Sequence, residues 1–210
     1  MSLRVAVLIS GAGTNLQALL DTVHGRHGID IVAVASSTST AGGLVRAERA
    51  GVETAVFPIA EHRDRAARDR ALGRWLEQRS VDLVVLAGFM ELLDPELVRR
   101  FRDRMINVHP ALLPSFAGAH AIEKALEYGV KVMGVTVHFV DEGVDTGPII
   151  LQEAFELPYS RDIAEIEQRA HAVEHRLLPR AVRLIAEGSV RIDEHNPRLV
   201  HVDERGDGPD

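Results

Sequence analysis

The feature that most constrains the fold is a short apolar segment that runs directly into a glycine-containing turn. Val5–Ile9 consists only of Val, Ala, Leu and Ile, which is typical of a strand buried on both faces. The turn Ser10–Asn15 follows it, and Leu16–Val23 then has the pattern of a helix. A buried strand that leads through a tight turn into a helix is typical of α/β proteins with a parallel sheet.

The same alternation of strand and helix continues along most of the chain. One helix begins at Asp94-Pro95, because Asp is a favoured N-cap and Pro a favoured first helical residue. This rhythm predicts an α/β fold, namely a Rossmann-like, open, mostly parallel twisted sheet with helices on both faces. We expect the other strands at Ile29–Ala35, Thr54–Phe57, Leu83–Ala87, Met105–Val108, Met133–Val140 and Ile149–Phe155, and the other helices at Leu44–Ala50, Arg63–Arg79 and Ile163–Ala186.

The chain length of 210 residues fits a single domain. No internal repeat or clear linker divides the sequence. We therefore expect one domain over residues 1–195 and a C-terminal tail over residues 196–210, frayed from Asp203 on.

Composition excludes several classes of function. The 24 Lys and Arg against 31 Asp and Glu give a net charge of −7, which disfavours a nucleic-acid partner. The absence of cysteine excludes disulfides, thiolate nucleophiles and Cys-ligated metals, and it fits the cytosol. No apolar run approaches the roughly 18 residues of a membrane span, and the start does not resemble a signal peptide. We expect a cytoplasmic protein without a membrane partner.

The turn Ser10–Asn15 is a candidate phosphate site. In open α/β sheets ligands bind at the carboxyl ends of the strands, and a helix N-terminus attracts anions. A dinucleotide fingerprint would require glycine at Leu16 and an acid near Ser36-Ser37, and a Walker motif would require Lys after Gly13. These departures favour a single phosphate monoester. The alternative is a glycine turn that only begins a helix.

A second candidate site combines an amide, an imidazole and a carboxylate. Asn107 and His109 lie two residues apart at a strand end and so share a face. Asn can donate to a developing oxyanion, and His can move a proton near neutral pH. Asp145, in a turn-rich loop, would favour the charged imidazolium if it reached His109. The alternative is a structural His-Pro pair at a strand end.

A third pattern lies in the last helix. The segment His171–His175 matches the H-x-x-E-H zinc signature, with two histidines one helical turn apart and Glu174 between them. No third ligand is specified. The alternative is a solvated stripe of polar residues on a helix.

Five sequence blocks together resemble the phosphoribosylglycinamide formyltransferase family of folate-dependent enzymes. They occur in the family's order, and the resemblance covers the chain from Val5 to about His195. Any one block is a weak signal, whereas the set is highly specific. The blocks are SGAGTNLQA at 10–18, VLAGFM at 85–90, INVHPALLP at 106–114, TVHFV at 136–140 and DTGPII at 145–150.

The resemblance implies transfer of a formyl group from 10-formyltetrahydrofolate to the amine of glycinamide ribonucleotide in purine synthesis. It implies a phosphate-binding N-terminal half and a folate-binding, catalytic C-terminal half. It also implies no metal and no tightly bound cofactor, because the folate is a cosubstrate, and a monomer or homodimer acting on small molecules. The matching positions are Asn107, His109 and Asp145 for catalysis; Gly13, Thr14, Asn15 and Glu174 for the nucleotide substrate; and Arg65, Met90, Glu91, Leu92, Leu93, Asn107, Val140, Asp141 and Asp145 for the folate.

The chain departs from the family pattern at two places. Glu91 stands where many members have a basic residue, which could weaken folate binding if the folate's glutamate tail passes nearby. Ala117 replaces a proline of the Leu-Leu-Pro-x-x-Pro-Gly stretch, so we expect a more mobile loop at Ser115–His120.

Relatives with a similar site offer other interpretations. Formyltetrahydrofolate hydrolase uses water as acceptor and normally carries an extra N-terminal domain. Methionyl-tRNA formyltransferase carries a further C-terminal domain, for which we see neither room nor basic charge. A binding module without catalysis would need Gly13–Asn15 but not Asn107, His109 and Asp145.

Overall fold

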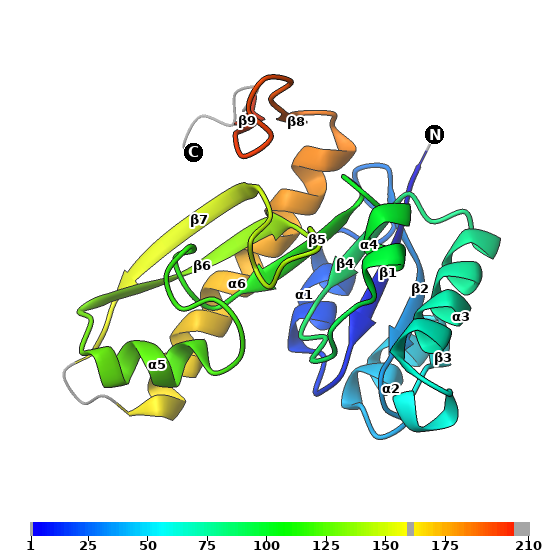
Figure 1. Cartoon of the computed structure of the whole chain (residues 1–210), viewed down its shortest axis with the longest axis horizontal. Coiled ribbons are helices and arrows are strands. Elements are labelled where there is room, and N and C mark those ends of the chain that lie inside the picture. Colours follow the sequence, from blue (N-terminus) through cyan, green and yellow to red (C-terminus); the bar gives the residue numbers. More distant parts are fainter. Residues whose placement is uncertain (1, 159–161, 204–210) are drawn as a thin grey trace.

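The apolar run at the start of the chain forms an inner strand of one sheet (Figure 1). The computed structural model describes residues 2–158 and 162–203. Within these ranges seven strands lie in the order β3-β2-β1-β4-β5-β6-β7. The strands β1 to β5 pair in parallel, and β6 is antiparallel to β5 and β7, so the predicted mostly parallel sheet is confirmed. The strands are β1 Leu3–Ile9, β2 Ile29–Ser36, β3 Glu53–Val56, β4 Leu83–Leu86, β5 Met105–His109, β6 Val132–Phe139 and β7 Ile149–Glu156.

Helices cover both faces of the sheet because the β1 side chains point alternately to opposite sides. Val5, Val7 and Ile9 pack in a core with α1, α2 and α6, whereas Ala6 and Leu8 pack with α3 and α4. No helix in the described part of the chain is long and apolar enough to cross a membrane. The helices are α1 Thr14–Thr22, α2 Gly42–Arg49, η1 Ile59–Glu61 (a 3-10 turn), α3 Arg65–Gln78, α4 Pro95–Arg100, α5 Ala121–Tyr128 and α6 Ile163–Ala186.

The strand order reverses direction between β1 and β4. The chain leaves β1 toward β2 on one side, and it leaves β4 toward β5 on the other. The loops that follow these two strands therefore diverge, and such a crevice is where open α/β sheets bind ligands. Two hydrogen bonds join the loops: Ser10 N donates to Gly88 O (3.0 Å), and Met90 N donates to Ser10 Oγ (2.9 Å).

Four elements lie outside the sequence expectations: the 3-10 turn η1, the helix α5 and the strands β8 and β9. The helix α5 was not predicted, and residues after α6 form a hairpin of β8 (Val190–Ile192) and β9 (Val200–Val202). The hairpin extends into the segment expected to be a tail. Val190, Ile192, Val200 and Val202 pack against the main apolar core, and Arg198 Nη1 donates to Thr146 O (2.7 Å). Fraying was expected from Asp203 on, but Asp203 N donates to Ser189 O (2.9 Å). Residues 204–210 lie outside the described ranges.

Candidate active site

Two strands bring three polar side chains to the carboxyl end of the sheet. Asn107 and His109 share one face of β5, as the alternation along the strand predicts. Because β6 runs antiparallel to β5, His138 comes directly opposite Asn107 in the ladder. His109 and His138 are buried, with exposed fractions of 6% and 2%.

Asp145 reaches these side chains from the loop between β6 and β7. Asn107 Nδ2 donates to Asp145 Oδ1 (3.2 Å), and His109 Nδ1 lies 3.3 Å from Asp145 Oδ2. The backbone N–H of Gly118 donates to the same Oδ2 (2.8 Å). The carboxylate is thus surrounded by donors, and the contact with His109 that the sequence left open is present.

The contacts of His109 suit a charged imidazolium. Its Nδ1 faces the Asp145 carboxylate, and its Nε2 lies 3.0 Å from the carbonyl oxygen of Phe116. Both neighbours are acceptors, and only the imidazolium carries a proton on each ring nitrogen. The site therefore places an acceptor beside each ring nitrogen of His109.

His138 is a site residue that the sequence reasoning missed. Its Nδ1 donates to Phe139 O (2.7 Å), so in the neutral ring Nε2 accepts from Asn107 Nδ2 (3.2 Å). The two hydrogens of the Asn107 amide are thus shared between His138 and Asp145. The available signal was a histidine within a mostly apolar strand.

The charge on Asp145 is strongly favoured. Burial opposes ionisation, but the neighbouring His138 and His109 rings and the Gly118 N–H together lower the pKa of Asp145 from 3.8 to about 2. Asp145 is therefore an anion throughout the physiological range.

The loop around Asp145 is held by its own side chains. Asp141 Oδ1 accepts from Gly143 N (3.0 Å) and from Thr146 Oγ1 (2.6 Å). Asp145 has a φ of 53°, which Asp tolerates better than most residues. A Cβ at Gly147 would lie 1.8 Å from the Phe139 carbonyl oxygen, so only glycine fits there. Asp141, predicted to contact the folate, uses its carboxylate within this loop.

The predicted phosphate loop lies between β1 and α1. Gly13, at the N-cap of α1, has a φ of 73°, and no side chain caps the first N–H groups of the helix. Those groups have no partner within a helix and are suited to an anion. A Cβ at Gly13 would lie 2.5 Å from Gly43 Cα, so glycine lets this turn pack directly against α2. Thr14 is the first residue of the helix.

Two predicted substrate residues that lie 159 positions apart meet beside this loop. Asn15 Nδ2 donates to Glu174 Oε2 (2.7 Å), and both side chains are buried. The other amide atom, Asn15 Oδ1, is buried and has no hydrogen-bond partner. A buried acceptor left unpaired is unfavourable, so a ligand donor would stabilise it.

Arg46 is a second residue that the sequence did not reveal. From α2, its Nε donates to Ala12 O (2.9 Å) and its Nη1 to Gln17 Oε1 (3.0 Å). A guanidinium thus lies against the phosphate loop. No sequence signal marked it, because it comes from another helix 34 residues after Ala12.

The residues predicted to contact the folate lie on several elements. The Met90 and Leu92 side chains are exposed, at 82% and 59%, whereas Leu93 and Val140 pack against one apolar cluster. Arg65, the first residue of α3, is exposed. Glu91 is partly buried beside Arg68, at 3.7 Å.

The histidines of the zinc-like pattern are separated from its glutamate. The rings of His171 and His175 stack with centroids 6.0 Å apart, while Glu174 binds Asn15. In residues 2–158 and 162–203 no three possible metal ligands cluster. The pattern is explained by a glutamate that faces the crevice loop and two histidines on another part of the helix surface.

Comparison with known proteins identifies the family. Residues 3–182, from β1 through most of α6, match the formyl transferase family. The chain belongs to this family. One relative is the phosphoribosylglycinamide formyltransferase of Haemophilus influenzae. It is 39% identical to this chain over 193 residues, which is 91% of each chain.

Two further formyl transferase relatives extend the comparison. Glycinamide ribonucleotide transformylase 1 from Symbiobacterium toebii has a crystal structure with a TM-score of 0.91 at 46% identity, covering 96% of this chain and 94% of that one. The trifunctional purine biosynthetic protein adenosine-3 of Bos taurus is 46% identical over 202 residues. The chain spans 20% of the length of that protein, which is therefore much larger than this formyl transferase unit.

We predict that Gly13→Ala destabilises the fold more than Gly25→Ala. Both glycines have positive φ, 73° and 69°, so alanine costs about 1–2 kcal/mol at either. Only at Gly13 would the new Cβ also collide with backbone, at Gly43. Urea unfolding measures the loss of unfolding free energy in each variant. Equal losses would show that the close packing of this turn against α2 does not contribute to stability.

We predict a pH-dependent effect of Asp145→Asn on stability. Because folding lowers this pKa from 3.8 to about 2, the stabilisation by ionised Asp145 is complete above about pH 4 and is lost as pH falls through about 2. Its size is on the order of 2 kcal/mol. Urea unfolding across pH should give a constant difference from wild type at higher pH that shrinks below about pH 4. A difference still undiminished at about pH 3 would contradict the assignment.

Proposed function

We propose that the chain transfers the formyl group of 10-formyltetrahydrofolate to the amine of 5'-phosphoribosylglycinamide, giving formylglycinamide ribonucleotide. The observation that carries the proposal is the cluster of Asn107, His109 and Asp145 at the carboxyl end of the sheet, in a member of the formyl transferase family. Relatives named for this reaction, similar over most of this chain, support it.

The cluster suits a tetrahedral intermediate. The substrate amine attacks the formyl carbon, a C–N bond forms, and the formyl oxygen becomes an oxyanion. The charged His109 and an N–H of Asn107 would stabilise that oxygen. Both hydrogens of Asn107 are engaged in the free chain, so substrate binding would exchange one of them. The bond to the folate nitrogen then breaks and that nitrogen is protonated.

Asp145 acts by charge rather than as a base. A carboxylate with a pKa of about 2 is a poor proton acceptor near neutral pH. Its role is to hold His109 as imidazolium and to organise water, which would carry the proton from the attacking amine toward the leaving nitrogen. A water-mediated route leaves the charge of the site unchanged after each turnover.

The substrates would approach the cluster from the two loops of the crevice. The phosphate would bind at the α1 N-terminus, at Gly13 and Thr14, and Arg46 adds a positive charge beside it. Asn15 and Glu174 would bind the rest of the nucleotide. The folate would lie between the segment Met90–Leu93, which includes Glu91 and Leu92, and the residues Arg65, Asn107, Val140, Asp141 and Asp145.

The remaining expectations stay predictions. We expect a cosubstrate folate rather than a tightly bound cofactor, no metal, a monomer or homodimer, and a cytoplasmic location. The single domain over residues 1–195 with a tail over 196–210 is likewise a prediction, although β9 lies inside that tail.

The decisive test is to follow tetrahydrofolate release from 10-formyltetrahydrofolate with and without glycinamide ribonucleotide. Release that requires the nucleotide, with formylated nucleotide as product, supports transfer. Equal release without the nucleotide would replace transfer by the hydrolase alternative. No release in either case would leave only a binding module.

We predict that Asn107→Ala and Asp145→Asn each lower turnover by about 10²–10³, the typical cost of losing one oxyanion-stabilising group. Circular dichroism should remain native. Asp103→Asn is a matched control, because Asp103 is an exposed aspartate whose φ of 59° is close to that of Asp145. Its turnover should match wild type. Turnover within about threefold of wild type in either test variant would remove that residue from the mechanism.

A further inference from the structure

A buried ion pair lies next to the proposed folate segment and has no part in the chemistry above. Arg68 and Asp69 are neighbours in α3, with exposed fractions of 0% and 1%. Arg68 Nε donates to Asp69 Oδ1 (2.6 Å). Burial of two charges is costly, and a buried pair is weak support for stability alone. The contacts of the pair point to another role.

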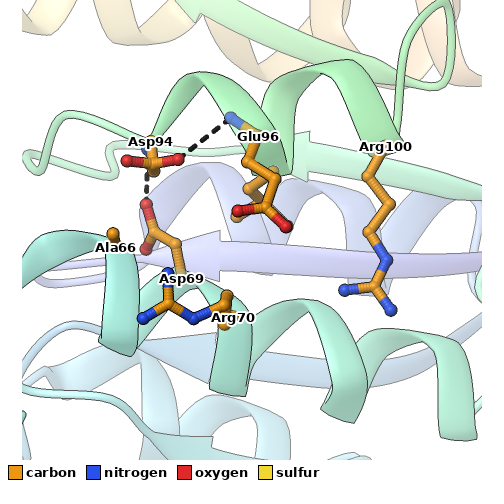
Figure 2. A pocket seen from close by; sticks show the side chains of 7 residues that line it. Ala66, Asp69, Arg70, Asp94, Glu96 and Arg100 are labelled. Carbon is orange, nitrogen blue, oxygen red and sulfur yellow. Dashed lines mark hydrogen bonds between the residues drawn. The ribbon is translucent and has the colours of Figure 1, made fainter.

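The pair contacts the segment Phe89–Asp94 along most of its length. Arg68 Nη2 donates to Leu92 O (3.0 Å), and its guanidinium carbon lies 5.6 Å from the centre of the Phe89 ring. Figure 2 shows Asp69 reaching from α3 to the start of α4, where its Oδ2 accepts from Asp94 N (2.5 Å). Two adjacent side chains thus fix both the middle and the end of this segment.

The third nitrogen of the guanidinium faces Glu91. Arg68 Nη1 is buried without a hydrogen bond, and it lies 3.7 Å from Glu91 Oε2. Glu91 is the position at which the family resemblance implies a basic residue. A cation from α3 therefore lies beside the Glu91 carboxylate of the segment.

The opposite end of the segment is fixed as well. Met90 N is bound to Ser10 Oγ across the crevice, while Leu92 O is bound inward to Arg68. With the backbone held at these two points, the Met90 and Leu92 side chains are left exposed, at 82% and 59%. The backbone of a short loop that would otherwise be mobile is thereby preorganised.

We propose that Arg68 is a positioning residue for folate: it fixes the segment Phe89–Asp94 and holds the Glu91 carboxylate away from the incoming cosubstrate. The inference rests on the proposed function, because that function identifies the ligand of this segment as folate. Because Arg68 contacts the folate segment and not the phosphate loop, its loss should affect one substrate and not the other.

The test compares steady-state kinetics of wild type, Arg68→Met and Arg68→Lys for each substrate. Arg68→Met should raise the KM for 10-formyltetrahydrofolate about tenfold or more, because Leu92 O loses its buried charged donor. The KM for glycinamide ribonucleotide should stay within about twofold. Arg68→Lys should give an intermediate folate KM, because lysine keeps the charge but not the planar fork of donors.

Arg4→Met is the matched control. Arg4 Nε and Nη2 both donate to Arg79 O (3.0 and 2.8 Å), a similar guanidinium–carbonyl contact near the amino end of β1, far from the crevice loops. Its loss should lower the melting temperature without a change specific to the folate KM. An equal rise in both KM values for Arg68→Met, or the same folate effect in Arg4→Met, would reduce Arg68 to a structural residue.

Arg68→Met leaves the Asp69 carboxylate buried without its cation, which can prevent folding. If Arg68→Met does not fold, the variants Arg68→Lys and Glu91→Gln still test the proposal. If Arg68 acts partly through Glu91, the folate KM of the double variant Arg68→Lys/Glu91→Gln should be no higher than that of Arg68→Lys alone. Independent, multiplicative effects would overturn the role assigned to Glu91.

Titration with tetrahydrofolate alone separates this inference from the proposed function. If wild type binds tetrahydrofolate about tenfold more tightly than Arg68→Lys or Arg68→Met but transfers no formyl group, the proposed function fails and the positioning role stands. If wild type transfers the formyl group and the Arg68 variants bind tetrahydrofolate as wild type does, the positioning role fails and the function stands.

Discussion

The pairing of β1 with β4 is the constraint on which the rest of the molecule depends. Val5–Ile9 is fully buried, so β1 must have a strand on each side and a helix layer on each face. Since the chain turns away from this pair in opposite directions, the loops after β1 and β4 diverge and leave a crevice. Ser10 bridges that divergence by bonding with both Gly88 and Met90.

The polar cluster depends on a second constraint, the reversal of direction at β6. Because β6 is antiparallel to β5, its last residues lie at the amino-terminal half of β5, and the loop that follows returns toward β7. This path places Asp145 against Asn107 and His109, and places His138 opposite Asn107. The polar groups of the cluster satisfy one another: donors surround the Asp145 carboxylate, and acceptors face both nitrogens of His109.

Local patterns in the sequence predicted the sheet and many positions at its edge, but not the contacts among them. Alternation alone placed Asn107 and His109 on one face of a strand. The contact between His109 and Asp145 depends on a loop path set by Asp141, Thr146 and Gly147, which no periodicity encodes. A resemblance to a family could match those positions without providing their geometry.

Burial of charge was the least predictable property. Arg68 lies in a helix rich in charged residues, where a solvated side chain is the ordinary expectation, yet it is fully buried. Arg46 likewise lies on a helix whose sequence says nothing of the loop it contacts. The hairpin of β8 and β9 was missed because each strand has only three residues, too few to show a pattern, although Val190, Ile192, Val200 and Val202 pack against the main core.

Because the Asn107 amide already has hydrogen-bond partners in the free chain, it would bind the substrate and the intermediate with different strength. Its two N–H groups already have partners, so a neutral formyl oxygen gains little by replacing one of them. An oxygen that has become an anion gains much more, because hydrogen bonds to charged acceptors are roughly twice as strong as neutral ones. In the proposed mechanism, the Asn107 amide would therefore contribute little to substrate affinity and would bind the intermediate more strongly, which is the condition under which binding accelerates a reaction.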